Sequence, residues 1–112
     1  MQESMPERVA EKVKRMIERL SSIMKVEAVY LYGSYARGNW LKTSDVDLIV
    51  VSKGFSKLSF MERLDLVNRL SWELGEKPHL EIIPLTPEEL EEKMDVGVLV
   101  RDASKYWVKI YP

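Results

Sequence analysis

Apolar residues recur every three or four positions near the start of the chain, which is the spacing of one helix face. Glu and Lys residues fill the intervening positions. Ser4 and Glu7 form a candidate capping box, in which Pro6 is tolerated in the first turn. The pattern predicts an amphipathic helix of about five turns. Its apolar face would consist of Val9, Val13, Met16, Ile17, Leu20 and Met24.

Two more segments show helical spacing further along the chain. The first ends near Gly75, and its apolar face would consist of Phe60, Leu64, Val67, Leu70 and Leu74. In the second, Thr86 is a suitable N-cap and Pro87 a suitable first helical residue, which predicts a helix that continues to about Met94. The pattern over residues 96–104 favours a further short helix.

Short apolar runs between these helices are typical of strands. The four runs are Val26–Tyr32, Val46–Val51, His79–Leu85 and Trp107–Tyr111. Val46–Val51 is almost continuously apolar, so both faces of that strand should be buried. A short helix is predicted over residues 34–38, followed by a polar loop over 39–44. The alternation of helices and strands predicts a compact α/β sheet fold, with residues 1–112 forming a single domain.

The composition excludes several classes of site. The chain contains no cysteine and one histidine, His79, which excludes disulfides, thiol catalysis and a multi-histidine metal cage. No apolar stretch approaches the ~20 residues that cross a bilayer. Met1–Ser4 lacks an apolar signal core, so we expect a cytoplasmic protein without membrane contact. Seventeen basic and eighteen acidic residues leave a net charge of −1, which favours small molecules or proteins over nucleic acid as partners.

The residues with the clearest chemical potential lie between Tyr32 and Val51. Asp45 and Asp47 are two positions apart at the start of a predicted strand, so both side chains should point to the same face. Neighbouring carboxylates repel each other and are stabilised by a divalent cation between them, and hard oxygen ligands suit Mg²⁺ or Mn²⁺. The apolar residues that follow, Leu48–Val51, would anchor the pair in the core.

A second group of candidate residues precedes the loop. Gly33 and Ser34 follow a predicted strand and open a predicted helix, where free backbone N–H groups and a hydroxyl can bind phosphate. Arg37 lies one turn later and can face a phosphate or a carboxylate. Gly38 allows the chain to reverse into the loop, which would return Ser44 towards Ser34. We assign all five residues to a candidate nucleotide site, because a phosphate site beside paired carboxylates suits phosphoryl or nucleotidyl transfer.

The spacing of these residues resembles the signature of a known superfamily. The pattern is G-S-x-x-R-G, six residues, then D-x-D and four apolar residues, over Gly33–Val51. It is similar to that of the DNA-polymerase-β-like nucleotidyltransferases, and specifically of their minimal single-domain members, which are commonly encoded beside a HEPN-domain partner. The resemblance implies a palm fold, a small mixed sheet of about four strands packed by helices. It also implies that Gly33 and Ser34 bind a nucleoside triphosphate and that Asp45 and Asp47 bind catalytic Mg²⁺.

The superfamily also has a third carboxylate on a neighbouring strand, usually an aspartate. Glu81 is the candidate for this metal-binding and catalytic position, because a glutamate between apolar residues is costly to bury and would therefore face a metal. Glutamate is one methylene longer than aspartate, which changes how it would activate an attacking hydroxyl. His79 shares the predicted face of Glu81, where it would either hydrogen-bond Glu81 or serve as a strand-edge residue without a catalytic role.

Two functions are consistent with these residues. In the first, the protein is an enzyme that moves a nucleoside monophosphate, AMP from ATP, to a hydroxyl with two Mg²⁺ ions held by Asp45, Asp47 and Glu81. The resemblance implies a HEPN-type toxin as the acceptor and an antitoxin role for this protein. In the alternative, the protein is a weak or inactive nucleotide-binding antitoxin that neutralises its partner by binding. Aromatic residues near the C-terminus also suggest a homodimer.

Overall fold

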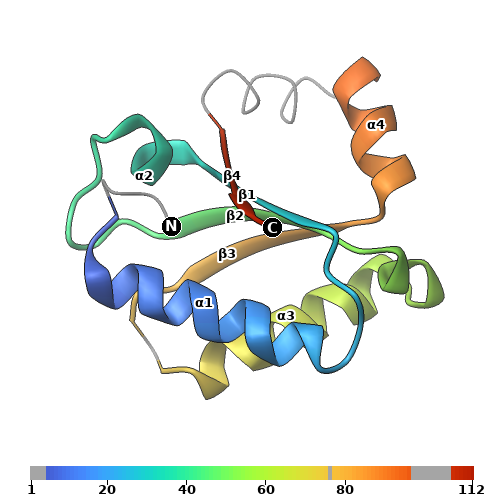
Figure 1. The fold of residues 1–112 in the computed structure, drawn as a ribbon, viewed down its shortest axis with the longest axis horizontal. Coiled ribbons are helices and arrows are strands. Elements are labelled where there is room, and N and C mark those ends of the chain that lie inside the picture. Colours follow the sequence, from blue (N-terminus) through green and yellow to red (C-terminus); the bar gives the residue numbers. More distant parts are fainter. Residues whose placement is uncertain (1–4, 76, 97–106) are drawn as a thin grey trace.

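The fold alternates helices and strands along the chain (Figure 1). The structure is a computed structural model that describes residues 5–75, 77–96 and 107–112. The strands are β1 (Ala28–Tyr32), β2 (Val46–Val51), β3 (Leu80–Leu85) and β4 (Val108–Tyr111). The helices are α1 (Glu7–Ser21), α2 (Gly33–Arg37), the 3₁₀-helix η1 (Lys53–Lys57), α3 (Phe60–Glu73) and α4 (Pro87–Val96). The strands and helices predicted within the described residues are confirmed, whereas the short helix expected over 96–104 falls almost wholly outside them.

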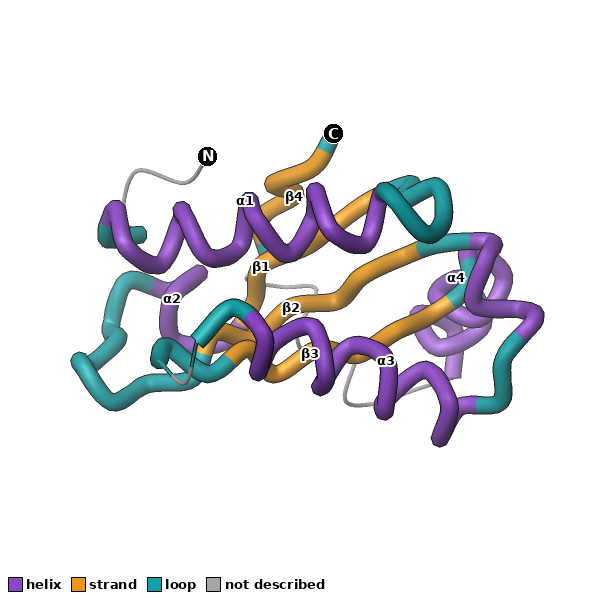
Figure 2. The backbone as a smooth tube through the Cα atoms, turned by 90° about the horizontal axis from the view of Figure 1, so that it is seen from below, coloured by secondary structure: helices purple, strands orange, loops and turns teal. Residues whose placement is uncertain are grey.

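The four strands form one mixed sheet, which confirms the predicted fold class. Their order is β3-β2-β1-β4, with β1 antiparallel to both β2 and β4, and β2 parallel to β3. The connection from β2 to β3 runs through η1 and α3, because parallel neighbours need a long crossover. Figure 2 shows α1 and α3 lying together on one face of the sheet.

The main core lies between the sheet and these two helices. Val46, Leu48 and Val50 of β2 pack in this core, whereas the alternate residues Ile49 and Val51 pack on the opposite face. All five are buried, which confirms that β2 is covered on both sides. The helices contribute Val9, Val13, Met16 and Leu20 from α1 and Val67 and Leu70 from α3.

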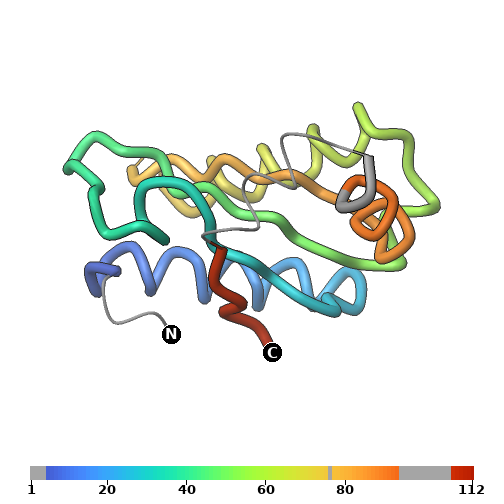
Figure 3. The backbone as a smooth tube through the Cα atoms, turned by 90° about the horizontal axis from the view of Figure 1, so that it is seen from above, coloured from blue at the N-terminus to red at the C-terminus, as the bar shows by residue number. Residues whose placement is uncertain are grey.

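A smaller apolar cluster covers one end of the opposite face. It contains Ile49 and Leu85, with Leu90 of α4 and Trp107 packed against it. The Trp107 ring stacks on Tyr30 with the ring centroids 4.5 Å apart. Figure 3 shows α4 at this end of the face, and α2 with the loop before β2 at the other end. The second end, where β2 and β3 begin, carries polar residues.

None of the described helices is long and apolar enough to cross a membrane. Side chains cap the starts of α3, where Ser59 and Glu62 form a capping box, and of α4. Thr86 caps α4 as predicted, because its Oγ1 accepts the Glu89 N–H at 3.2 Å. At α1 the predicted place of Pro6 inside the first turn is wrong. Pro6 is the N-cap residue, because the first residue of α1 is Glu7. The Pro6 carbonyl accepts the Val9 N–H of the first turn at 3.0 Å. Ser4 lies outside the described residues.

Candidate active site

The predicted carboxylates gather at the end of the sheet where β2 and β3 begin. The parallel register pairs Asp47 of β2 with Glu81 of β3, and the antiparallel register pairs Asp47 with Tyr32 of β1. Side chains of directly paired residues share a face of the sheet. Tyr32, Asp47 and Glu81 therefore form one row across three strands, on the face away from α1 and α3.

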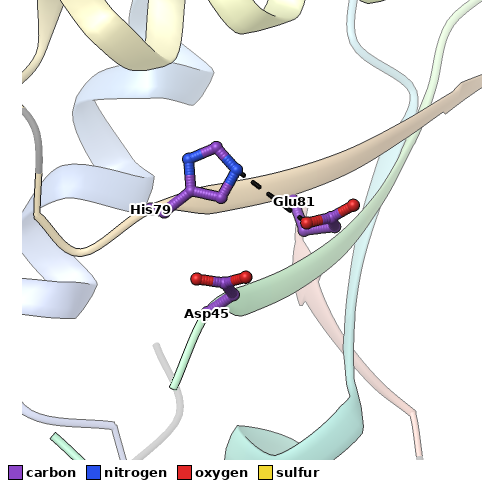
Figure 4. A group of neighbouring side chains, drawn as sticks. All are labelled: Asp45, His79 and Glu81. Atoms are coloured by element: carbon purple, nitrogen blue, oxygen red, sulfur yellow. Dashed lines mark ion pairs between the residues drawn. The ribbon is translucent and has the colours of Figure 1, made fainter. Parts of the chain in front are cut away.

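Asp45 and His79 extend this row by one further pair. The Val46 N–H donates to the His79 carbonyl at 2.9 Å, which continues the pairing ahead of both strands. Ligand atoms of Asp45, His79 and Glu81 all lie within 4.8 Å of one another (Figure 4). His79 Nε2 is 3.8 Å from Glu81 Oε2, so the ring is part of the carboxylate cluster rather than an isolated strand-edge residue.

The ionised form of Asp47 is electrostatically disfavoured. Burial raises the pKa of Asp47 to about 6, with further contributions from the negative charges of Glu81 and Asp45, whereas Arg37 opposes the shift. Burial and the same kind of repulsion, from Asp47 and Glu81, raise the pKa of Tyr32 to about 12. A cation bound among these groups would favour the ionised carboxylate. The electrostatics of this end of the sheet therefore suit a positively charged ligand.

The start of α2 lies directly against the carboxylate row. A Cβ atom on Gly33 would be 2.2 Å from Asp47 Oδ2, and Gly33 has a φ of +70°. Space and backbone conformation therefore both require glycine at this position. Gly38 follows α2 with a φ of +81° and reverses the chain into the loop, as predicted. The segment from Gly33 to Gly38 thus holds Ser34 next to the carboxylates.

One expectation about an individual residue is wrong. The Glu81 side chain is 57% exposed rather than buried, because α4 and Trp107 pack against the other end of this face. Its place in the site comes from its pairing with Asp47, not from the cost of burying a carboxylate. The Ser44 hydroxyl accepts the Leu41 N–H at 2.8 Å within the loop before β2.

Sequence reasoning did not single out Tyr32 as a member of the row. Its position follows from the β1–β2 register, in which Tyr32 pairs with Asp47. A hairpin register depends on the length and conformation of the connection, and the loop between these strands contains a helix. The one local signal for Tyr32 is its position directly before Gly33, at the end of a strand that leads into the predicted nucleotide site.

The donor set fits a hard divalent cation. Asp45 and Glu81 supply carboxylate oxygens within the group of ligand atoms described above, and Mg²⁺ and Mn²⁺ prefer such oxygens. Asp47 is not a member of that group, but it lies close enough for both carboxylates to raise its pKa. An imidazole nitrogen suits softer metals better than Mg²⁺. His79 therefore fits the role of a neighbour of Glu81, with its Nε2 at 3.8 Å from Glu81 Oε2, while the three carboxylates form the candidate metal ligands.

The fold and this site together define a class of protein. The family model for the nucleotidyltransferase domain matches residues 13–109, and the chain belongs to this family. The family expected from the Gly33–Val51 pattern is thereby confirmed, and the protein is a nucleotidyltransferase.

Particular relatives agree with this assignment. The chain is 35% identical to MJ1379 of Methanocaldococcus jannaschii, named "Putative protein adenylyltransferase", over 72 residues that make up 61% of this chain and 72% of that protein. A crystal structure of a "putative nucleotidyltransferase" from Sulfolobus solfataricus has a TM-score of 0.61 and 30% identity, covering 76% of this chain and 73% of that chain. A crystal structure described as "the toxin-antitoxin with AMP-PNP" shares the fold, with a TM-score of 0.57 and 18% identity over 90% of this chain and 71% of that chain.

Proposed function

We propose that the protein is an adenylyltransferase that moves AMP from ATP to a hydroxyl group of a partner protein. The observation that carries this proposal is the gathering of three carboxylates on one face, with Gly33 packed against Asp47. Ligand atoms of Asp45 and Glu81 lie within 4.8 Å of each other, and Asp47 pairs with Glu81 in the sheet and interacts electrostatically with both. The name of MJ1379 specifies protein adenylylation for a relative and supports the choice of nucleotide and acceptor. We propose that residues 1–112 act as one such domain in the cytoplasm.

In this proposal the nucleotide lies beside α2. The first N–H groups of a helix have no partner within it, so the backbone of Gly33 and Ser34 can donate to the triphosphate together with the Ser34 hydroxyl. Arg37 adds a positive charge near the same place, since it acts on Asp47. Gly38 and Ser44 shape the loop that follows and complete the proposed nucleotide site.

The three carboxylates would hold two Mg²⁺ ions, or Mn²⁺ in their place. When bound, such ions neutralise the triphosphate and stabilise the attacking and leaving oxygens. Asp45, Asp47 and Glu81 contribute by fixing the position of this charge on the rigid starts of β2 and β3. The raised pKa of Asp47 is consistent with a site that is completed by a cation.

The transfer step forms one bond and breaks one. The acceptor oxygen bonds to the α-phosphorus of ATP, while the bond from that phosphorus to the oxygen bridging the β-phosphate breaks and pyrophosphate leaves with the electron pair. The hydroxyl proton passes to Glu81, the candidate base. Because the Glu81 side chain is 57% exposed, a hydroxyl carried by a second protein can approach it from solvent.

We further propose that the acceptor is a HEPN-type toxin and that this protein acts as its antitoxin. The Gly33–Val51 pattern and the fold shared with the toxin-antitoxin structure support this choice. The alternative is an antitoxin that neutralises its partner by binding alone. The glutamate at position 81, in place of the usual aspartate, is the observation that favours this alternative.

The test is the transfer of α-labelled ATP, with Mg²⁺, to the product of the adjacent gene. We expect label on the partner protein with the parent enzyme and a loss of at least a thousandfold with Asp45→Asn/Asp47→Asn, because the substitution removes the metal ligands. Asp65→Asn is the matched control, since Asp65 is exposed on α3, on the other face of the sheet.

The outcomes separate the two functions. Label that persists in Asp45→Asn/Asp47→Asn would contradict the assignment of the site. If the partner binds but no label moves, with Mg²⁺ or Mn²⁺ and with each of the four nucleotides, the binding-only antitoxin replaces the enzyme. In that case Glu81→Asp tests whether the longer side chain is the reason.

A further inference from the structure

A cleft of about 650 Å³ opens beside the carboxylate cluster. Its walls come from the first turn of α1, from the loop before β2 and from the segment before β3, and they include Arg8, Lys42 and Lys77. It shares Asp45 and His79 with the candidate metal site. We call this feature the basic cleft.

The basic cleft has a fixed wall. Lys12 lies one turn after Arg8 on α1, and its buried Nζ donates to the carbonyls of Gly75 and Pro78 at 2.6 Å each. These bonds hold the segment that carries Lys77 and His79 against α1. Because residues four apart lie on the same side of a helix, Arg8 is on the side of α1 that faces this segment, and both line the cleft.

The charge of the basic cleft differs from that of the chain. Arg8, Lys42 and Lys77 are exposed cations, whereas the whole chain has a net charge of −1. Asp45 is the one acidic residue among the described residues that line the cleft, and the proposed function commits it to the metal. The remaining charge attracts an anionic occupant.

The position of the basic cleft points to the acceptor rather than to the triphosphate. The described lining contains no residue of α2, where Gly33, Ser34 and Arg37 of the proposed nucleotide site lie, and it shares only Ser44 with that site. It contains His79, which pairs with Glu81, the candidate base. In an in-line displacement the attacking and leaving oxygens lie on opposite sides of the phosphorus. The attacking hydroxyl therefore approaches from the side of Glu81 and the cleft.

We propose that the basic cleft binds an acidic segment of the acceptor protein, next to the hydroxyl that receives AMP. This proposal rests on the proposed function and adds the chemistry of its substrate. Carboxylates form charge-assisted hydrogen bonds with Arg and Lys. A cleft of about 650 Å³ accommodates a few side chains. Its described lining contains no Phe, Tyr or Trp, the larger rings on which single-stranded nucleic acids stack.

The binding test uses two fluorescent probes, a random Glu–Tyr copolymer and a random Lys–Tyr copolymer of equal length. Fluorescence anisotropy measures their binding to the protein saturated with Mg²⁺ and a non-hydrolysable ATP analogue. We expect the Glu–Tyr probe to bind at least tenfold more tightly than the Lys–Tyr probe. We expect a triple variant of the cleft, Arg8→Gln/Lys42→Gln/Lys77→Gln, to bind the Glu–Tyr probe at least tenfold more weakly. Its affinity for ATP should be unchanged.

The matched control is Lys14→Gln/Arg15→Gln/Lys53→Gln, which removes the same charges from exposed positions outside the cleft. It should change the binding of the Glu–Tyr probe less than twofold. The proposal is overturned if both triple variants weaken the probe equally, or if neither copolymer binds. It is also overturned if the cleft variant loses ATP affinity instead, which would place the triphosphate there. Tighter binding of an oligouridylate than of the Glu–Tyr probe would assign the cleft to RNA.

The transfer of label separates this proposal from the proposed function. If AMP moves to the Glu–Tyr copolymer, the KM for the copolymer should rise tenfold in the cleft variant while the KM for ATP stays constant. If no AMP moves to either copolymer or to the partner protein, but the cleft variant still loses the Glu–Tyr probe, the adenylyltransferase proposal fails. The cleft is then a binding site for an acidic segment of a protein that does not receive AMP.

Discussion

At the scale of single residues, Gly33 and Asp47 depend on each other. Asp47 Oδ2 occupies the space in which a Cβ on residue 33 would lie, 2.2 Å away. This close approach lets the proposed phosphate-binding backbone reach the carboxylate row. A larger residue would push apart α2 and β2, the two elements that carry the site. Position 33 therefore links the stability of the fold to nucleotide binding.

Gly33→Ala should lower the free energy of unfolding by about 3 kcal/mol, because left-handed backbone strain and the collision with Asp47 act together. Gly38→Ala is the matched control, since Gly38 has a φ of +81° and nothing within 4 Å of its added Cβ. It should lose about 1 kcal/mol from backbone strain alone. Urea denaturation measures both losses. Equal losses would show that Asp47 does not restrict position 33.

At the scale of elements, α1 is tied to the segment that leads into β3. Lys12 makes this connection, because its Nζ donates to the Gly75 and Pro78 carbonyls. The Lys12 side chain is buried, and burial lowers its pKa. That segment continues into His79 of the carboxylate cluster. One buried side chain on a distant helix therefore positions part of the site without touching its carboxylates.

Lys12→Met should lower the free energy of unfolding by about 2 kcal/mol, because it keeps the side-chain volume but leaves the buried Pro78 carbonyl and the part-buried Gly75 carbonyl without their charged donor. The neighbouring exposed Lys14 supplies the control, and Lys14→Met should change stability by less than about 0.5 kcal/mol. The chain has one histidine, so the ring resonances of His79 report on the segment directly. They should shift in Lys12→Met and stay in place in Lys14→Met. Unchanged resonances together with unchanged stability would contradict the positioning role.

At the scale of the whole molecule, the carboxylate cluster reduces stability when no cation is bound. The pKa of Asp47 is raised to about 6 by burial and by Glu81 and Asp45, against about 3.9 in an unfolded chain. Between these values the folded protein retains a proton that the unfolded chain has lost. The contribution of Asp47 to stability therefore falls as the pH rises from about 4 to 6 and stays low above that range.

Asp47→Asn should therefore be more stable than the parent at pH 7 in EDTA, by about 1 kcal/mol after allowance for solvent screening of a half-buried group. The difference should vanish near pH 4. Thermal unfolding of the two proteins across this pH range checks the prediction, and the comparison cancels the titration of the carboxyl groups that do not interact with Asp47. Added Mn²⁺ should stabilise the parent at pH 7 and not the variant. A constant difference between the two proteins at all pH values would contradict the assigned cause.

Much of the fold could be predicted from local pattern. The spacing of apolar residues identified α1, α3 and the four strands. Side chains return to the same face every 3.6 residues in a helix and every second residue in a strand, so the face that packs in the core leaves a regular apolar pattern in the sequence. The Gly33–Ser34 and Asp45–Asp47 pairs could be identified in the same way, since each belongs to one short segment. The ends of elements were less certain, as Pro6 at the start of α1 shows.

The remaining parts of the site depend on tertiary contacts. The sequence by itself determined the family, the α/β class and the two motifs, because these are encoded in short-range spacing. The tertiary structure decided that Glu81 faces solvent beside Asp47, that His79 joins the carboxylates, and that a basic cleft adjoins them. The physical reason is that strand register and the packing of α1 against the segment before β3 bring together residues far apart in the chain, and no local pattern specifies such pairings.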